Sequence, residues 1–131
     1  MEFKKDINYS TSIERATLGI CMLETGIFGR IYGIVEKDCF YHSGHQVVFE
    51  TMVGMFQNGM NIDLLTVVDQ IIRVKGISEL EGYNTAYFVT RLTNDVVSSA
   101  HLEYHCHILK SMWMEREIMN LTSGGMGKLD G

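Results

Sequence analysis

Three histidines and one cysteine lie within seven residues, HLEYHCH at 101–107, a composition that could bind a metal ion. If this stretch is helical, His101 and His105 are four residues apart and could reach one zinc ion from the same face. His107 would point about 200° away from His105, so a third ligand would have to come from another segment. We therefore expect no metal site, and a small metal-dependent enzyme that uses His101 and His105 is the least favoured alternative.

A glycine cluster, TSGGMGKLDG at 122–131, is the second stretch that could do chemistry. A phosphate-binding loop requires a glycine five residues before its Gly-Lys pair and a Ser or Thr after the lysine. Thr122 and Leu129 occupy those two positions, and the stretch follows a helical pattern instead of a strand. We expect a glycine-rich turn or frayed tail here, and no catalytic or cofactor-binding residue in the chain.

The composition favours a protein that binds other proteins. The 131 residues fit one domain, and 11 basic against 16 acidic residues give a net charge of −5. Such a charge predicts little direct DNA binding, since that affinity comes from clustered positive charge. No apolar run is long enough to span a membrane, and the polar start lacks a secretory signal. The three cysteines form no CxxC pair, so the sequence predicts a cytoplasmic protein.

Apolar residues recur at helical spacing along most of the chain, and no proline interrupts it. The fold class is therefore predicted to be all-α, a compact bundle of about five or six short helices followed by a long C-terminal helix. The predicted organisation is an N-terminal tail at 1–11, a helical globular domain at 12–98, the long helix at 99–121 and the glycine-rich tail at 122–131. Helical segments are expected at 12–26, 27–35, 43–59, 62–76, 84–95 and 100–121.

The last helical pattern carries more apolar surface than one small core needs. Its apolar residues lie on more than one side of the predicted helix, which indicates a surface that binds a partner. The predicted protein interface comprises Leu102, Tyr104, Ile108, Leu109, Met112, Trp113 and Met119.

Five short motifs follow one another along the chain. They are Glu14-x-Ala16-x-Leu18-Gly19, FYHSGHQVVFETM at 40–52, GMNIDLLT at 59–66, Ala86-Tyr87-Phe88 with Leu92, and Ser99-Ala100 through Tyr104 and Ile108. This ordered series resembles the N-terminal domain of replicative DNA helicases of the DnaB family. The resemblance covers about residues 12–119, and it is more specific than any single motif.

The resemblance implies structural roles for several residues. Glu14 and Gly19 belong to its opening motif, and Phe49 would lie in the core. Asp63 would cap the fourth helix. His45 would hydrogen-bond the loop that precedes its helix, and would have no catalytic role.

The resemblance also implies a function. The domain would be the collar of a ring-shaped helicase, assembling as dimers and as a hexamer that is a trimer of dimers, and docking primase and the helicase loader. Its long helix would be the first arm of a helical hairpin, with the second arm and the ATPase motor absent from this chain. The chain itself would be no enzyme and hold no cofactor, whereas the parent helicase would use ATP and magnesium. A free-standing helical adaptor without a motor is the main alternative.

Overall fold

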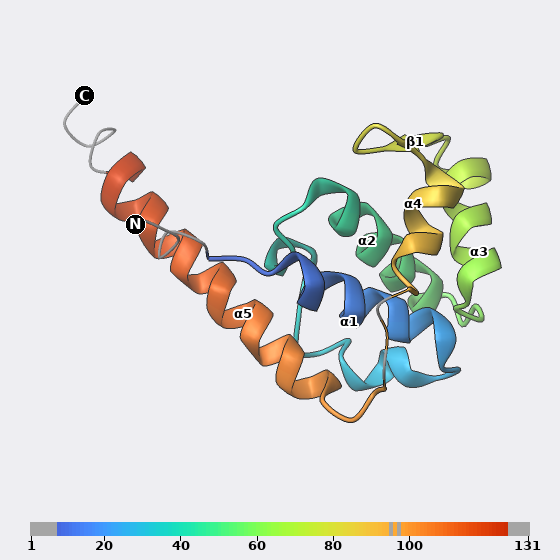
Figure 1. Cartoon of the computed structure of the whole chain (residues 1–131), viewed down its shortest axis with the longest axis horizontal. Helices are drawn as coiled ribbons and strands as arrows, with labels where there is room; N and C mark the ends of the chain where they lie inside the picture. Colours follow the sequence, from blue (N-terminus) through green and yellow to red (C-terminus); the bar gives the residue numbers. More distant parts are fainter. Residues whose placement is uncertain (1–7, 95, 97, 126–131) are drawn as a thin grey trace.

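The computed structural model describes residues 8–94, 96 and 98–125, with side chains as far as residue 122. The main helices are α1 (Thr11–Leu23), α2 (Ser43–Gln57), α3 (Leu64–Asp69), α4 (Thr85–Arg91) and α5 (Leu102–Met119) (Figure 1). Short turns of helix lie between or after them at η2 (Ile27–Arg30), η3 (Lys37–Cys39), η4 (Gln70–Val74) and η5 (Asn120–Gly125). Within this described part, no helix is both long and apolar enough to cross a membrane.

The prediction of a helical fold with a long C-terminal helix is confirmed. The first four helices enclose one apolar core, to which α2 contributes Val48, Phe49 and Met52. Phe49 lies in the middle of an aromatic group, with its ring centroid 5.0 Å from Phe40 and 5.6 Å from Phe28. The buried residues of α5 pack against this core.

Side-chain caps define where three of the helices begin. The Ser10 hydroxyl accepts from the Ile13 N–H at the start of α1. Asp63 accepts from the Thr66 N–H, while the Thr66 hydroxyl accepts from the Asp63 N–H, forming a reciprocal capping box before α3. Asn84 accepts from the Tyr87 N–H before α4. These caps satisfy backbone donors that a helix start leaves free.

Two predicted helices are shorter than expected. The segment 27–35 forms helix only over Ile27–Arg30 and continues as turns. Helix α3 ends as an α-helix at Asp69, and a wider π turn completes the segment to Val74. Gly76 then follows with φ of 72°, a left-handed conformation that glycine adopts without a steric penalty.

A two-stranded hairpin, β1 (Glu79–Leu80) and β2 (Tyr83–Asn84), was not predicted. Its two-residue turn is Glu81-Gly82, with φ of 53° and 85°. Positive φ at both central residues is typical of the turn that best matches the twist of paired strands. Glutamate at the first turn position is a weak signal for such a turn, so the sequence pattern alone did not indicate a hairpin.

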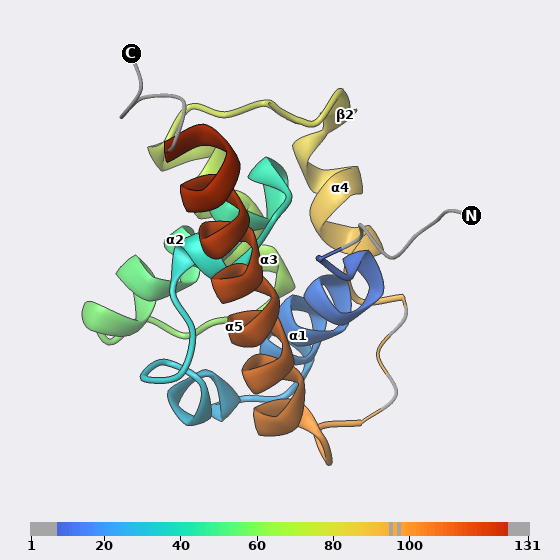
Figure 2. The ribbon, with the colours of Figure 1, turned by 90° about the vertical axis from the view of Figure 1, so that its left-hand side faces the viewer.

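Helix α5 lies along one side of the globular domain, and its C-terminal half projects beyond it (Figure 1). Turned by 90°, the same helix crosses in front of α1 and α2 (Figure 2). The segment that leads into α1 runs back toward the middle of α5. The chain therefore presents a long helix that is supported on one face and open on others.

Candidate protein-interaction surface

One stripe of α5 packs on the globular domain. Leu102, Cys106 and Leu109 are buried, and the half-buried Trp113 continues the stripe against the core. These residues follow one another at intervals of four, three and four, so they share one narrow face of the helix. Because this face is buried, a partner could contact only the remaining faces of α5.

A different face of α5 is exposed where the helix leaves the domain. Met114 and Ile118 of α5, and Leu121 in the adjoining turn η5, are 50%, 59% and 70% exposed, and their spacing of four and three places them close together. We call these three residues the distal apolar face. An exposed group of large apolar side chains at the end of a projecting helix is typical of an interaction site.

The seven residues that the sequence predicted as interface lie in different environments. Leu102 and Leu109 are 2% and 1% exposed, so they belong to the core of this chain and not to an accessible interface. Tyr104 and Met119 are exposed, while Ile108, Met112 and Trp113 are half-buried. Apolar periodicity located the helix correctly but did not distinguish its core face from its open face, because both carry large apolar residues.

Arg30 ties the beginning of α5 to the domain. Its guanidinium donates two hydrogen bonds to the Glu103 carboxylate, at 2.7 and 2.6 Å, and a third to the Ser99 carbonyl oxygen. The hydrogen bonds from Arg30 lower the pKa of Glu103 to about 2. The paired fork holds the first turn of α5 against η2.

Arg116 ties the projecting half of α5 to the domain. It donates to the backbone oxygen of Asn8 at 2.7 Å and to that of Cys39 at 3.2 Å. Its Cζ atom also lies 5.6 Å from the ring centroid of Tyr41, and the Tyr41 ring stacks parallel to that of Tyr9 at 3.8 Å. One cation thus joins α5, the N-terminal segment and the loop before α2.

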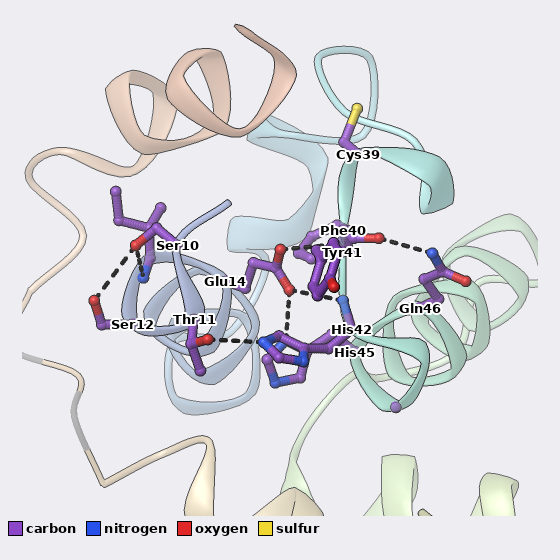
Figure 3. Close-up of polar contacts among 12 residues, drawn as sticks. Ser10, Thr11, Ser12, Glu14, Cys39, Phe40, Tyr41, His42, His45 and Gln46 are labelled. Atoms are coloured by element: carbon purple, nitrogen blue, oxygen red, sulfur yellow. Dashed lines mark hydrogen bonds and ion pairs between the residues drawn. The ribbon is translucent and has the colours of Figure 1, made fainter. Parts of the chain in front are cut away.

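The loop that carries Tyr41 is hydrogen-bonded to the buried carboxylate of Glu14, which lies beside it (Figure 3). The Tyr41 N–H donates to Oε2 at 2.7 Å, and the His42 N–H donates to Oε1 at 3.4 Å. The His45 Nδ1 lies 2.7 Å from Oε1, which assigns its proton to Nδ1, because a carboxylate can only accept. Both side chains of this Glu14–His45 pair are buried.

The position of His45 corrects the expectation drawn from its place in the sequence. Its ring bonds the Glu14 carboxylate, and Glu14 instead makes the hydrogen bonds to the loop. Glu14 is fully buried, and its carboxylate accepts from the N–H groups of Tyr41 and His42, which immediately precede α2. A carboxylate 28 residues from His42 cannot be recognised as its partner from spacing alone.

Gly19 allows close approach between α1 and the end of α4. A Cβ atom at this position would overlap the Leu92 carbonyl oxygen and lie 2.6 Å from Cγ2 of Val96. A larger residue would push the two segments apart, so the glycine in this motif is required by packing.

The histidines that first suggested metal chemistry do not gather further ligands in the described structure. The His101 and His105 rings are 6.3 Å apart at their centroids. Within residues 8–94, 96 and 98–125, no group of three or more His, Cys, Asp or Glu side chains is placed to hold a metal ion. Gly127 and Lys128 lie outside the described residues.

The three buried cysteines have unreactive thiols. Burial raises the pKa of the Cys106 thiol to about 12 and also raises the pKa of Cys21 and Cys39. A thiol reacts as its thiolate, so none of the three is activated as a nucleophile. Together with the geometry above, this leaves a protein-binding surface as the best-supported candidate site.

Comparison with known proteins identifies the family. Residues 6–111 match the family model described as the DnaB-like helicase N terminal domain. The chain therefore belongs to this family. The fold agrees, because the crystal structure of the N-terminal domain of DnaB helicase from Mycobacterium tuberculosis superposes with a TM-score of 0.79 at 17% identity, covering 95% of this chain and 88% of that one.

Full-length relatives of this DnaB-family domain extend well beyond the matched region. The replicative DNA helicase DnaB of Rhodothermus marinus is 32% identical over 117 residues, which are 88% of this chain and 12% of that protein. The replicative DNA helicase DnaC of Bacillus subtilis is 24% identical over 110 residues, 84% of this chain and 24% of that protein. The chain thus spans a quarter or less of these relatives.

Proposed function

We propose that this chain is the N-terminal collar of a replicative DNA helicase, where it mediates assembly of a hexameric ring and docks primase and the helicase loader. In this proposal the whole protein uses ATP and magnesium to unwind DNA through a motor domain that lies outside this chain. Membership of the DnaB family supports the helicase context. The structural observation that best supports the assembly role is the exposed distal apolar face at the end of α5.

The distal apolar face suits self-association. Its three side chains project from a helix that Arg30 and Arg116 hold at two points, so the surface is preorganised before a partner binds. Burying exposed apolar side chains against a second copy would remove them from water, which is the main favourable term in association. The predicted second arm of the hairpin would cover the same helix, and the interface with a neighbouring subunit would extend from it.

The proposal is tested by exchanging Ile118→Ser and Met114→Ser together and measuring self-association by sedimentation across a range of concentrations. Loss of two large apolar contacts should weaken association by at least roughly ten-fold, since ten-fold corresponds to about 1.4 kcal/mol. The control is Leu65→Ser on α3, because Leu65 is 81% exposed but lies on another helix. Equal association of both variants would argue against an interface at α5.

A motorless helical adaptor remains the second candidate function, because it would use the same surface. The two functions differ in what the complete protein does. ATP-dependent unwinding of a forked DNA by the full-length protein supports the helicase proposal, whereas a full-length protein that binds a helicase collar without hydrolysing ATP would support the adaptor.

A further inference from the structure

The guanidinium of Arg91, at the end of α4, has an unusual environment. The other four arginines each donate to an oxygen atom. Arg30 and Arg73 donate to the carboxylates of Glu103 and Asp69. Arg15 and Arg116 donate to the backbone oxygens of Arg91 and Asn8. No hydrogen bond or ion pair within residues 8–94, 96 and 98–122 involves the guanidinium of Arg91. Its five N–H donors are therefore available to an acceptor from outside this part of the chain.

Two exposed tyrosines hold this guanidinium in place. The Arg91 Cζ atom lies 5.4 Å from the ring centroid of Tyr83 and 5.6 Å from that of Tyr87. The two rings are 5.6 Å apart, and the tyrosines are 46% and 54% exposed. A cation over aromatic faces is attracted to them, so the arginine is positioned without using its hydrogen-bond donors. Tyrosine and arginine are also among the residue types enriched at the energetically dominant positions of protein interfaces.

Arg91 and Tyr83 line a hollow of about 210 Å³ between α1, α2, the hairpin and α4. Its charged members are Arg15, Arg91, Glu81 and the titratable His42 and His45. Glu81 is already engaged, because its Oε2 accepts from the Gly44 N–H at 2.7 Å and its Oε1 lies 3.9 Å from Nδ1 of His42. The Glu81 carboxylate is therefore occupied by its own partners and is not paired with the Arg91 guanidinium.

We propose that Arg91, with Tyr83 and Tyr87, forms a second docking surface that binds an aspartate or glutamate side chain of a partner protein. The planar fork of arginine matches a carboxylate with two parallel hydrogen bonds, and the adjacent hollow accommodates the chain that carries it. Nucleic-acid affinity comes from clustered positive charge, whereas this surface relies on the one guanidinium of Arg91, which favours a single carboxylate over a phosphate backbone. The surface lies on α4 and the hairpin, at the opposite end of the domain from the distal apolar face (Figure 1).

The test titrates a hexaglutamate peptide into the 131-residue chain, with hexaglutamine as the neutral control. Binding is monitored by NMR of the arginine side-chain N–H signals. Binding of hexaglutamate should shift the Arg91 signal. The affinity for hexaglutamate should fall at least roughly ten-fold in Arg91→Gln and in Tyr87→Leu. Arg73→Gln is the matched control, because Arg73 is already paired with Asp69 at 2.9 Å and should not contribute. Circular dichroism shows whether each variant remains folded.

Three results would overturn the proposal. The first is that hexaglutamate gives no shift at Arg91, and the second is that it binds Arg91→Gln as well as the unaltered chain. Alternatively, a six-nucleotide oligothymidylate could bind at Arg91 more tightly than hexaglutamate, which would make the surface a nucleic-acid site. None of these outcomes affects the α5 proposal, since self-association is measured with the distal apolar face and its own variants.

Discussion

The guanidinium of Arg116 donates a hydrogen bond to the backbone oxygen of Asn8 at 2.7 Å, joining two residues that are 108 positions apart. The same guanidinium lies over the Tyr41 ring, and the Tyr41 backbone is held by Glu14. The direction in which α5 leaves the domain is therefore linked, through Tyr41, to the buried Glu14–His45 pair. Each residue of this connection can be changed separately.

Arg116→Met should loosen α5 without removing its apolar contacts. Methionine keeps much of the length of arginine but cannot donate to Asn8 or Cys39, and hydrogen bonds from a charged group contribute about 1.5–3 kcal/mol each. We expect faster amide hydrogen exchange in α5 near residue 116, with exchange in α2 less affected. Arg73→Met is the control, and equal protection of α5 in both variants would contradict the role of Arg116 as a tie.

Glu14→Ala should destabilise the domain strongly. The change leaves His45 and the Tyr41 N–H without their acceptor in a buried site, and loss of one member of a buried pair costs about 3–5 kcal/mol. Urea denaturation measures the free energy of unfolding. Glu50→Ala is the comparison, because the Glu50–Lys37 pair is exposed and such pairs contribute about 0–1 kcal/mol. Similar losses in both variants would show that the Glu14 network is unimportant.

Gly19→Ala and Gly54→Ala should change stability in opposite directions. A Cβ at Gly19 overlaps the Leu92 carbonyl, so we expect a loss of about 1–3 kcal/mol from overpacking. A Cβ at Gly54, inside α2, meets nothing within 4 Å, and alanine is favoured over glycine in a helix by about 1 kcal/mol. Thermal unfolding of the two variants tests this contrast, which fails if both shift the melting temperature alike.

The Arg30–Glu103 pair should contribute to the pH dependence of stability. Because the pKa of folded Glu103 is lowered from 4.5 to about 2, its contribution is present above pH 4.5 and is lost as the pH falls toward 2. Glu103→Gln should remove part of the change in the free energy of unfolding across that pH range. The side chains are 42% exposed, so salt should reduce the effect. An unchanged acid profile in Glu103→Gln would rule out this contribution.

Local patterns in the sequence determined the helical class, the long C-terminal helix and the family, because periodicity, caps and short ordered motifs are properties of neighbouring residues. The expected helix cap at Asp63 is present, since a cap acts within three positions of the sequence. Such signals do not depend on how distant segments meet.

Only the tertiary structure decided which face of α5 is covered and which carboxylate bonds His45. It also decided which arginine has no acceptor among the described residues. Leu109 and Ile118 are both apolar residues on one helix, yet the first is buried and the second is exposed. Glu14 and His45 are 31 positions apart, and Arg116 and Asn8 are 108 apart. The physical reason is that burial and long-range hydrogen bonds depend on the packing of segments brought together by folding, which one-dimensional spacing does not specify.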